Sequence, residues 1–134
     1  MNPTQIELVQ STFGNYVVPL GDAAADVFYE KLFALDPSMR ALFNGDMAVQ
    51  GHKLVGMLAV VVNGLHTPET IAGAAQQLGQ RHAGYGVQAR HYDTVGQVLL
   101  QTLQAAIGSA YTPDVHEAWT AAYALLASVM QHGG

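Results

Sequence analysis

Apolar residues recur every three or four positions along most of the chain, which is the spacing of one face of an α-helix. No run of β-branched residues alternates with polar ones, so no strand is predicted. Five apolar stripes follow the helical spacing: Phe28, Leu32 and Leu35; Leu54, Met57, Leu58, Val61 and Leu65; Ile71, Ala75 and Leu78; Val95, Leu99, Leu103 and Ile107; and Val115, Trp119, Ala122, Leu126 and Val129. The pattern therefore predicts an all-α fold.

Helix starts are marked by a capping residue followed by proline. The capping side chain accepts an N–H of the first turn, and proline has no N–H to leave unsatisfied there. Four junctions have this form: Asn2-Pro3, Asp36-Pro37, Thr67-Pro68 and Thr112-Pro113. Helix stops or turns are expected at Gly45, Gly86 and Gly108. Together these signals predict seven helices, near residues 4–18, 20–35, 37–43, 47–66, 68–84, 92–108 and 113–131.

The composition fits a single domain spanning residues 1–134. A chain of 134 residues can bury one core. Half of its residues are hydrophobic and only 11% are charged, which excludes disorder. So large an apolar fraction leaves surface that could face something other than protein, such as a cofactor.

Charge and cysteine content exclude several classes of partner. The net charge is -5 with five Lys and Arg and no basic cluster, so nucleic acid is not an expected partner. The absence of cysteine excludes disulfides and thiolate metal sites. The first residues do not have the pattern of a signal peptide. Two charge-free stretches, Leu54–Pro68 and Ala118–Gly134, contain polar residues and indicate buried helices rather than membrane spans. We expect a cytoplasmic protein without a membrane partner.

Of the six histidines, His82 has the most informative position. It continues the spacing of Ile71, Ala75 and Leu78 and so lies on the apolar face of its predicted helix. A histidine at such a position is more often a core residue whose imidazole is hydrogen-bonded to a carbonyl. The alternative is that it is a metal ligand. His52 is expected to face solvent. The remaining histidines lie near helix ends, on a mixed face or in the tail: His66, His91, His116 and His132. A single protein ligand suits haem, whose porphyrin supplies the other four, better than zinc.

Two polar residues could form the other side of such a pocket. Gln50 lies one turn before Leu54, and Tyr29 lies next to Phe28. A tyrosine hydroxyl and a glutamine amide are both hydrogen-bond donors, suited to a polarised oxygen ligand. Taken singly, Tyr29 could instead be a packing residue and Gln50 an exposed one. No carboxylate pair, Ser-His-Asp set or phosphate-binding glycine loop is found, so hydrolase and nucleotide chemistry have no candidates.

The residues also resemble a known family. FYEKLFALDPSMRALF, QRHAGYGVQARHYDTVGQVLL and EAWTAAYALLASVM are similar to helices of bacterial single-domain globins and of the globin half of flavohaemoglobins. The resemblance covers nearly the whole chain. It implies a globin fold, with about seven helices around a haem pocket.

The resemblance also implies roles for individual residues. His82 matches the axial ligand of the iron, and Phe43 matches the phenylalanine that packs on the porphyrin. Tyr29 and Gln50 match the distal donors. Further implied cofactor contacts are Phe28, Lys53, Leu54, Leu78, Arg81, Val87, Tyr92, Val95 and Tyr123. Of these, Lys53 and Arg81 would pair with the haem propionates, although solvated surface charges are an equal alternative.

Two features of flavohaemoglobins are not expected here. In those proteins the tyrosine that matches Tyr92 pairs with a glutamate of the last helix and tunes the axial histidine. This sequence ends at Gln131-His132-Gly133-Gly134 without that glutamate. It also lacks reductase domains, so any electrons would come from an external reductase.

The expected function is therefore reversible binding of oxygen, nitric oxide or carbon monoxide through haem b. Nitric oxide dioxygenation is the catalytic reaction that such a pocket could support. A haem-based sensor or electron carrier is one alternative, and a haem-free helical interaction module is another.

Overall fold

The computed structural model describes residues 1–43, 46–67, 69, 72–73 and 89–133, and every regular element among them is helical. This confirms the predicted all-α class. The α-helices are α1 (Pro3–Thr12), α2 (Asp22–Leu35), α3 (Met47–Asn63), α5 (Ala89–Ile107) and α6 (Pro113–Gly133). A π-helical turn, Phe13–Val17, and two 3₁₀ segments, Pro37–Leu42 and Gly108–Ala110, lie between them.

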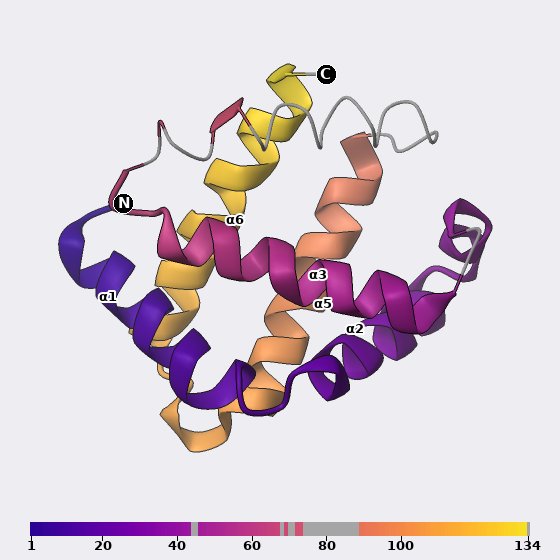
Figure 1. Cartoon of the computed structure of the whole chain (residues 1–134), viewed down its shortest axis with the longest axis horizontal. Coiled ribbons are helices and arrows are strands. Elements are labelled where there is room, and N and C mark those ends of the chain that lie inside the picture. The colour runs from indigo at the N-terminus through magenta and orange to yellow at the C-terminus, as the bar shows by residue number, and fades with distance from the viewer. Residues whose placement is uncertain (44–45, 68, 70–71, 74–88, 134) are drawn as a thin grey trace.

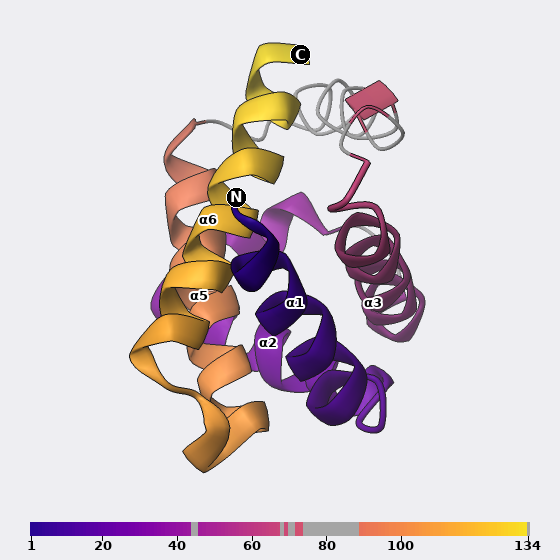
Figure 2. The ribbon, with the colours of Figure 1, turned by 90° about the vertical axis from the view of Figure 1, so that its left-hand side faces the viewer.

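The helices are arranged in two layers that cross. α3 crosses in front of α5 in Figure 1, and Figure 2 places it on the opposite side of the molecule from α5 and α6. α5 and α6 pack against each other, while α2 contacts both α3 and α5, and α1 packs mainly on α6. Within the described residues, no helix is both long and apolar enough to cross a membrane.

The local start signals correspond to real caps. The Asn2 side chain accepts from the Gln5 amide at 2.8 Å, and the Gln5 side chain accepts from the Asn2 amide at 3.2 Å. Asp36 accepts from the Ser38 amide at 3.1 Å. Thr112 accepts from the Val115 amide at 3.3 Å, and Gly108 has a φ of 67° where α5 ends. Pro68, Gly45 and Gly86 lie outside the described residues.

Several predicted boundaries are wrong by a few residues. The first helix does not remain an α-helix to residue 18, because the amide of Val18 bonds the carbonyl of Phe13 in a wider π turn. This turn leaves Phe13 and Val17 both buried. Leu35, assigned to a buried stripe, is 49% exposed because α2 ends there. α3 ends at Asn63 rather than near 66, and the segment predicted as helix 37–43 is 3₁₀.

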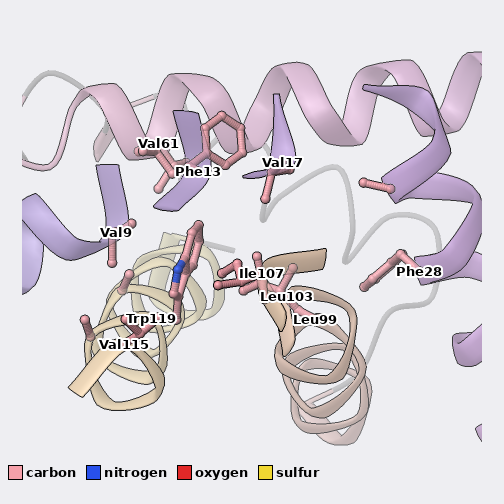
Figure 3. Packing of buried hydrophobic residues seen from close by; sticks show 14 of the residues in the cluster. Val9, Phe13, Val17, Phe28, Val61, Leu99, Leu103, Ile107, Val115 and Trp119 are labelled. Atoms are coloured by element: carbon pink, nitrogen blue, oxygen red, sulfur yellow. The ribbon is translucent and has the colours of Figure 1, made fainter. Parts of the chain in front are cut away.

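The largest part of the core joins α1, α5 and α6 beneath α3 (Figure 3). Trp119 of α6 is 2% exposed, and its ring lies 6.3 Å from that of Phe13. Its indole N–H donates to the Thr12 hydroxyl at 3.0 Å, and that hydroxyl donates to the Leu8 carbonyl at 2.6 Å. A buried indole N–H without a partner would be costly, so Thr12 matters for stability as an acceptor.

Replacing Thr12 with valine should lower the free energy of unfolding by about 1–3 kcal/mol, because the Trp119 N–H loses its partner. Thr102 is the matched control, since it has the same 6% exposure but only donates back to the Val98 carbonyl of its own helix. Thr102→Val should therefore have a smaller effect, below about 1 kcal/mol. Urea unfolding of both variants measures the difference, and equal losses would contradict the role given to Thr12.

Candidate functional site

The candidate site forms at a close approach of α2 and α3. A Cβ atom placed on Gly51 would lie 3.0 Å from the Cβ of Ala25, so the two helices meet with only small side chains between them. Tyr29 lies one turn after Ala25 on α2, and Gln50 directly precedes Gly51 on α3. The Tyr29 hydroxyl consequently donates to the backbone carbonyl of Gln50, at 3.5 Å. The structure thus brings together the two residues predicted as distal donors.

An aromatic cluster holds the Tyr29 ring in place. Phe33 stacks on it at 5.9 Å with an interplanar angle of 24°. Phe28 and Phe43 meet it edge to face at 5.2 and 5.3 Å, and Phe33 and Phe43 contact each other at 5.5 Å. Offset and edge-to-face contacts of this kind are favourable beyond the area that they bury. The ring of Tyr29 is therefore constrained on several sides, while its hydroxyl points toward α3.

The Tyr29 hydroxyl is a neutral hydrogen-bond donor, and the hydrogen bond that it makes in this structure is weak. Burial raises the pKa of Tyr29 to about 12, so the hydroxyl keeps its proton at neutral pH. Its bond to the Gln50 carbonyl, at 3.5 Å, is longer than the roughly 2.7–2.8 Å typical of hydroxyl donors. The hydroxyl can therefore turn to a better acceptor at small cost.

The hydrophobic cluster that Tyr29 joins contains other apolar side chains that are only partly covered. Four of them pack against the core and remain half-buried: Leu54 and Leu58 of α3, Phe43 directly after the 3₁₀ segment Pro37–Leu42, and Val95 of α5. Half-buried apolar side chains from several elements suit a flat hydrophobic group, because that group would remove them from water. The donor set and this apolar surface together fit a haem.

Tyr123 of α6 braces the first turns of α5. Its hydroxyl donates to the backbone carbonyl of Tyr92 at 2.7 Å. A Cβ on Gly96 would lie 2.6 Å from its ring, so the close packing of Tyr123 on α5 requires glycine there. Burial, with smaller contributions from Tyr92 and Asp93, raises the pKa of Tyr123. Tyr123 therefore fixes the position of the α5 backbone next to Val95.

The other predicted site residues have varied positions. Phe28 is 4% exposed and belongs to the hydrophobic core as well as touching Tyr29. Lys53 is exposed on α3, and Tyr92 is half-buried. Four predicted residues lie outside the described part of the chain: Leu78, Arg81, His82 and Val87.

The remaining histidines differ in their surroundings. His52 is exposed as expected, with 83% of its side chain accessible and Asp22 at 3.5 Å. His116 is exposed and shares a hydrogen bond of 2.8 Å with the Tyr111 hydroxyl. The predicted helix 92–108 left His91 outside, whereas the structure places His91 inside α5 with 5% exposure. The described helix begins by Ala89, three residues before the predicted start.

Sequence reasoning missed three residues that shape the site. Phe33 and Arg40 extend the aromatic cluster, with the Arg40 guanidinium 5.2 Å from the centre of the Phe33 ring. Gly51 permits the helix crossing. A glycine inside a helical pattern costs stability but gave no signal by itself, because Gly56 of the same helix has nothing within 4 Å of its Cβ position.

Comparison with known proteins gives the class. The globin family model matches residues 26–130, so the chain belongs to the globin family. This confirms the resemblance found in the sequence.

Individual relatives agree with this class. The flavohemoprotein of Xylella fastidiosa is 31% identical over 137 aligned residues that cover 97% of this chain, and the chain spans only 33% of that protein. One similar structure is an engineered carbene transferase, derived from a candidate nitric oxide dioxygenase of Rhodothermus marinus. Its TM-score is 0.88 at 26% sequence identity, and the match covers 98% of this chain and 92% of the carbene transferase chain. A bacterial globin from Campylobacter jejuni shares the fold, with a TM-score of 0.85, 19% identity and coverage of 98% and 95%.

Substituting Gly51 with valine should force α2 and α3 apart at Ala25. We expect a loss of about 1–3 kcal/mol in the free energy of unfolding, typical of overpacking. Gly56→Val on the same helix is the control, because a Cβ there meets nothing within 4 Å. That variant should gain a few tenths of a kcal/mol from helix propensity. Thermal unfolding compares the two, and similar melting temperatures would show that the crossing is not tight.

Proposed function

We propose that this globin binds haem b and through it reversibly binds oxygen and other diatomic gases, including nitric oxide and carbon monoxide. The observation that carries the proposal is the Tyr29 hydroxyl, protonated, weakly bonded and aimed at α3 beside a half-buried apolar surface. A donor in such surroundings has few uses in packing, but it can stabilise a polar ligand.

The haem would be held mainly by apolar contact. Phe43, Leu54 and Val95 present half-buried side chains to it, and the exposed Lys53 is available to a propionate. The family resemblance assigns the axial ligand to His82, with Leu78, Arg81 and Val87 nearby in the sequence. When bound, haem would supply an iron atom able to bind a diatomic gas.

The chain's own residues would then set how firmly a gas is held. Tyr29 turns from the Gln50 carbonyl, at 3.5 Å, and donates to the ligand. The Gln50 side chain offers an amide as a second donor from the adjacent helix. Leu54, one turn further along α3, and Phe28 behind Tyr29 keep water from competing for these donors.

Nitric oxide dioxygenation is the second function that we propose, and the Rhodothermus marinus relative favours it. In this reaction one oxygen molecule, one nitric oxide molecule and one electron give one nitrate ion. The electron would come from a separate reductase. Tyr29 and Gln50 would serve this reaction as they serve oxygen binding, by holding oxygen in the pocket.

Purified protein should carry haem and show its strong absorption band, with changes on reduction and on addition of carbon monoxide. His82→Ala should lose haem or bind it weakly, because no axial ligand remains. His52→Ala should keep the spectrum, since that side chain is 83% accessible to solvent. A colourless wild-type protein that takes up no added haem would instead indicate a haem-free helical module.

Tyr29→Phe should speed oxygen release by about 5- to 150-fold, the equivalent of losing a hydrogen bond of about 1–3 kcal/mol. Stopped-flow mixing of the oxygenated protein with carbon monoxide measures this rate. Tyr16→Phe is the control, because Tyr16 is 37% exposed and lies outside the aromatic cluster. With a reductase added, nitrate formation in the same variants tests the second function. An unchanged oxygen release rate in Tyr29→Phe would contradict the assignment of Tyr29 as a hydrogen-bond donor to the ligand.

A further inference from the structure

The Tyr111 side chain forms a pair with an imidazole at the start of α6. Its hydroxyl oxygen lies 2.8 Å from Nδ1 of His116, and the two rings meet edge to face at 5.7 Å with an interplanar angle of 78°. The Tyr111 ring packs against the hydrophobic core and is half-buried, whereas His116 is exposed. The pair therefore lies at the boundary between the core and the solvent.

The backbone on both sides of the pair is fixed. The Tyr111 amide donates to the Gly108 carbonyl at 3.0 Å, and the His116 amide donates to the Thr112 carbonyl at 2.9 Å. The Thr112 hydroxyl also accepts from the Val115 amide at 3.3 Å, which caps α6. The short distance between the hydroxyl and the imidazole is thus supported by the turn that begins α6.

The chemical nature of the hydrogen-bond partner distinguishes Tyr111 from two other tyrosines. The hydroxyl groups of Tyr29 and Tyr123 donate to backbone carbonyls, at 3.5 and 2.7 Å. A carbonyl accepts a hydrogen bond but is too weak a base to take the proton itself. A neutral imidazole is basic enough to take it, and Nδ1 of His116 accepts when the imidazole carries its own proton on Nε2.

This difference affects how easily a tyrosine loses an electron. Burial raises the pKa of Tyr111, so its phenol is neutral at neutral pH. A neutral phenol that loses an electron becomes a very strong acid, and its oxidation is costly unless the proton leaves at the same time. A base that is already hydrogen-bonded to the hydroxyl can take this proton as the electron leaves. Oxidation by one electron is therefore easier at Tyr111 than at Tyr29 or Tyr123.

We propose that Tyr111 and His116 form a proton-coupled redox site, which reduces strong one-electron oxidants, such as nitrogen dioxide, at the protein surface. Tyr111 gives one electron to the oxidant, and its hydroxyl proton moves to Nδ1 of His116. The products from nitrogen dioxide are nitrite, a neutral tyrosyl radical and an imidazolium. A soluble reductant such as ascorbate then returns one electron to the radical, and His116 returns the proton. None of these steps uses haem, so the proposal does not depend on the proposed function.

The probe oxidant is tris(bipyridine)ruthenium(III), made by a light flash with a cobalt(III) ammine as the electron acceptor. A nitroso spin trap then labels tyrosyl radicals, and mass spectrometry of peptides measures the label at each tyrosine. Protein that carries haem is used in its cyanide-bound ferric form, so that the iron is not the electron donor. Tyr111 should take up more label than Tyr16, although Tyr16 is the more exposed of the two, at 37%.

His116→Gln separates the two roles of the imidazole, because an amide oxygen can accept the hydrogen bond but cannot take the proton. The label at Tyr111, relative to that at Tyr16, should fall about 10²-fold, which is a typical contribution of a positioned base. His52→Gln is the matched control and should leave this ratio unchanged, since His52 is exposed and contacts Asp22 rather than a tyrosine.

Equal labelling of Tyr111 and Tyr16 in the wild-type protein would overturn the proposal. An unchanged ratio in a folded His116→Gln variant would overturn it as well, because the hydrogen bond alone would then account for the labelling. Failure of haem binding or of Tyr29→Phe would bear on the proposed function alone.

Discussion

The close crossing of α2 and α3 is the contact on which the candidate site depends. Gly51 and Ala25 are the two smallest residues that a helix can carry, and a Cβ at Gly51 would lie 3.0 Å from the Ala25 Cβ, so a larger side chain would force its neighbours to shift. Because Tyr29 and Gln50 lie next to this crossing, their separation follows from the approach of the helices rather than from their own interaction, which is weak. The Tyr29 hydroxyl is thus positioned by packing rather than by a strong hydrogen bond.

α3 has to serve the core and the site at once. Its C-terminal residues Val61 and Val62 are fully packed, while Leu54 and Leu58 earlier in the helix are half-buried. Lys53 is its only side chain with a permanent charge. This division explains why α3 contains so few charged residues, since apolar surface is needed on more than one side of the same helix.

The sequence was most informative where structure is local. Caps such as Asn2-Pro3 and Asp36-Pro37 act within one turn, so the positions of helix starts were predictable. The Gly51–Ala25 approach, the Trp119–Thr12 bond and the contact of Phe33 with Phe43 join segments whose meeting depends on the whole fold, so no local pattern revealed them. Tyr29 and Gln50 were raised as candidates by their positions, and the family resemblance gave them distal roles that stay predictions. For His82 the assignment still rests on that resemblance.

Two side-chain hydrogen bonds that join α1 to other helices bear on how the protein unfolds. Gln10 ties this helix to the end of α3, and Thr12 ties it to Trp119 of α6. Terminal helices often fray on their own, as the least protected units in hydrogen exchange. Here, lifting α1 would strip partners from a core indole and from a helix end. We therefore expect the N-terminal helix to unfold together with α6, although more than a hundred residues separate Thr12 from Trp119.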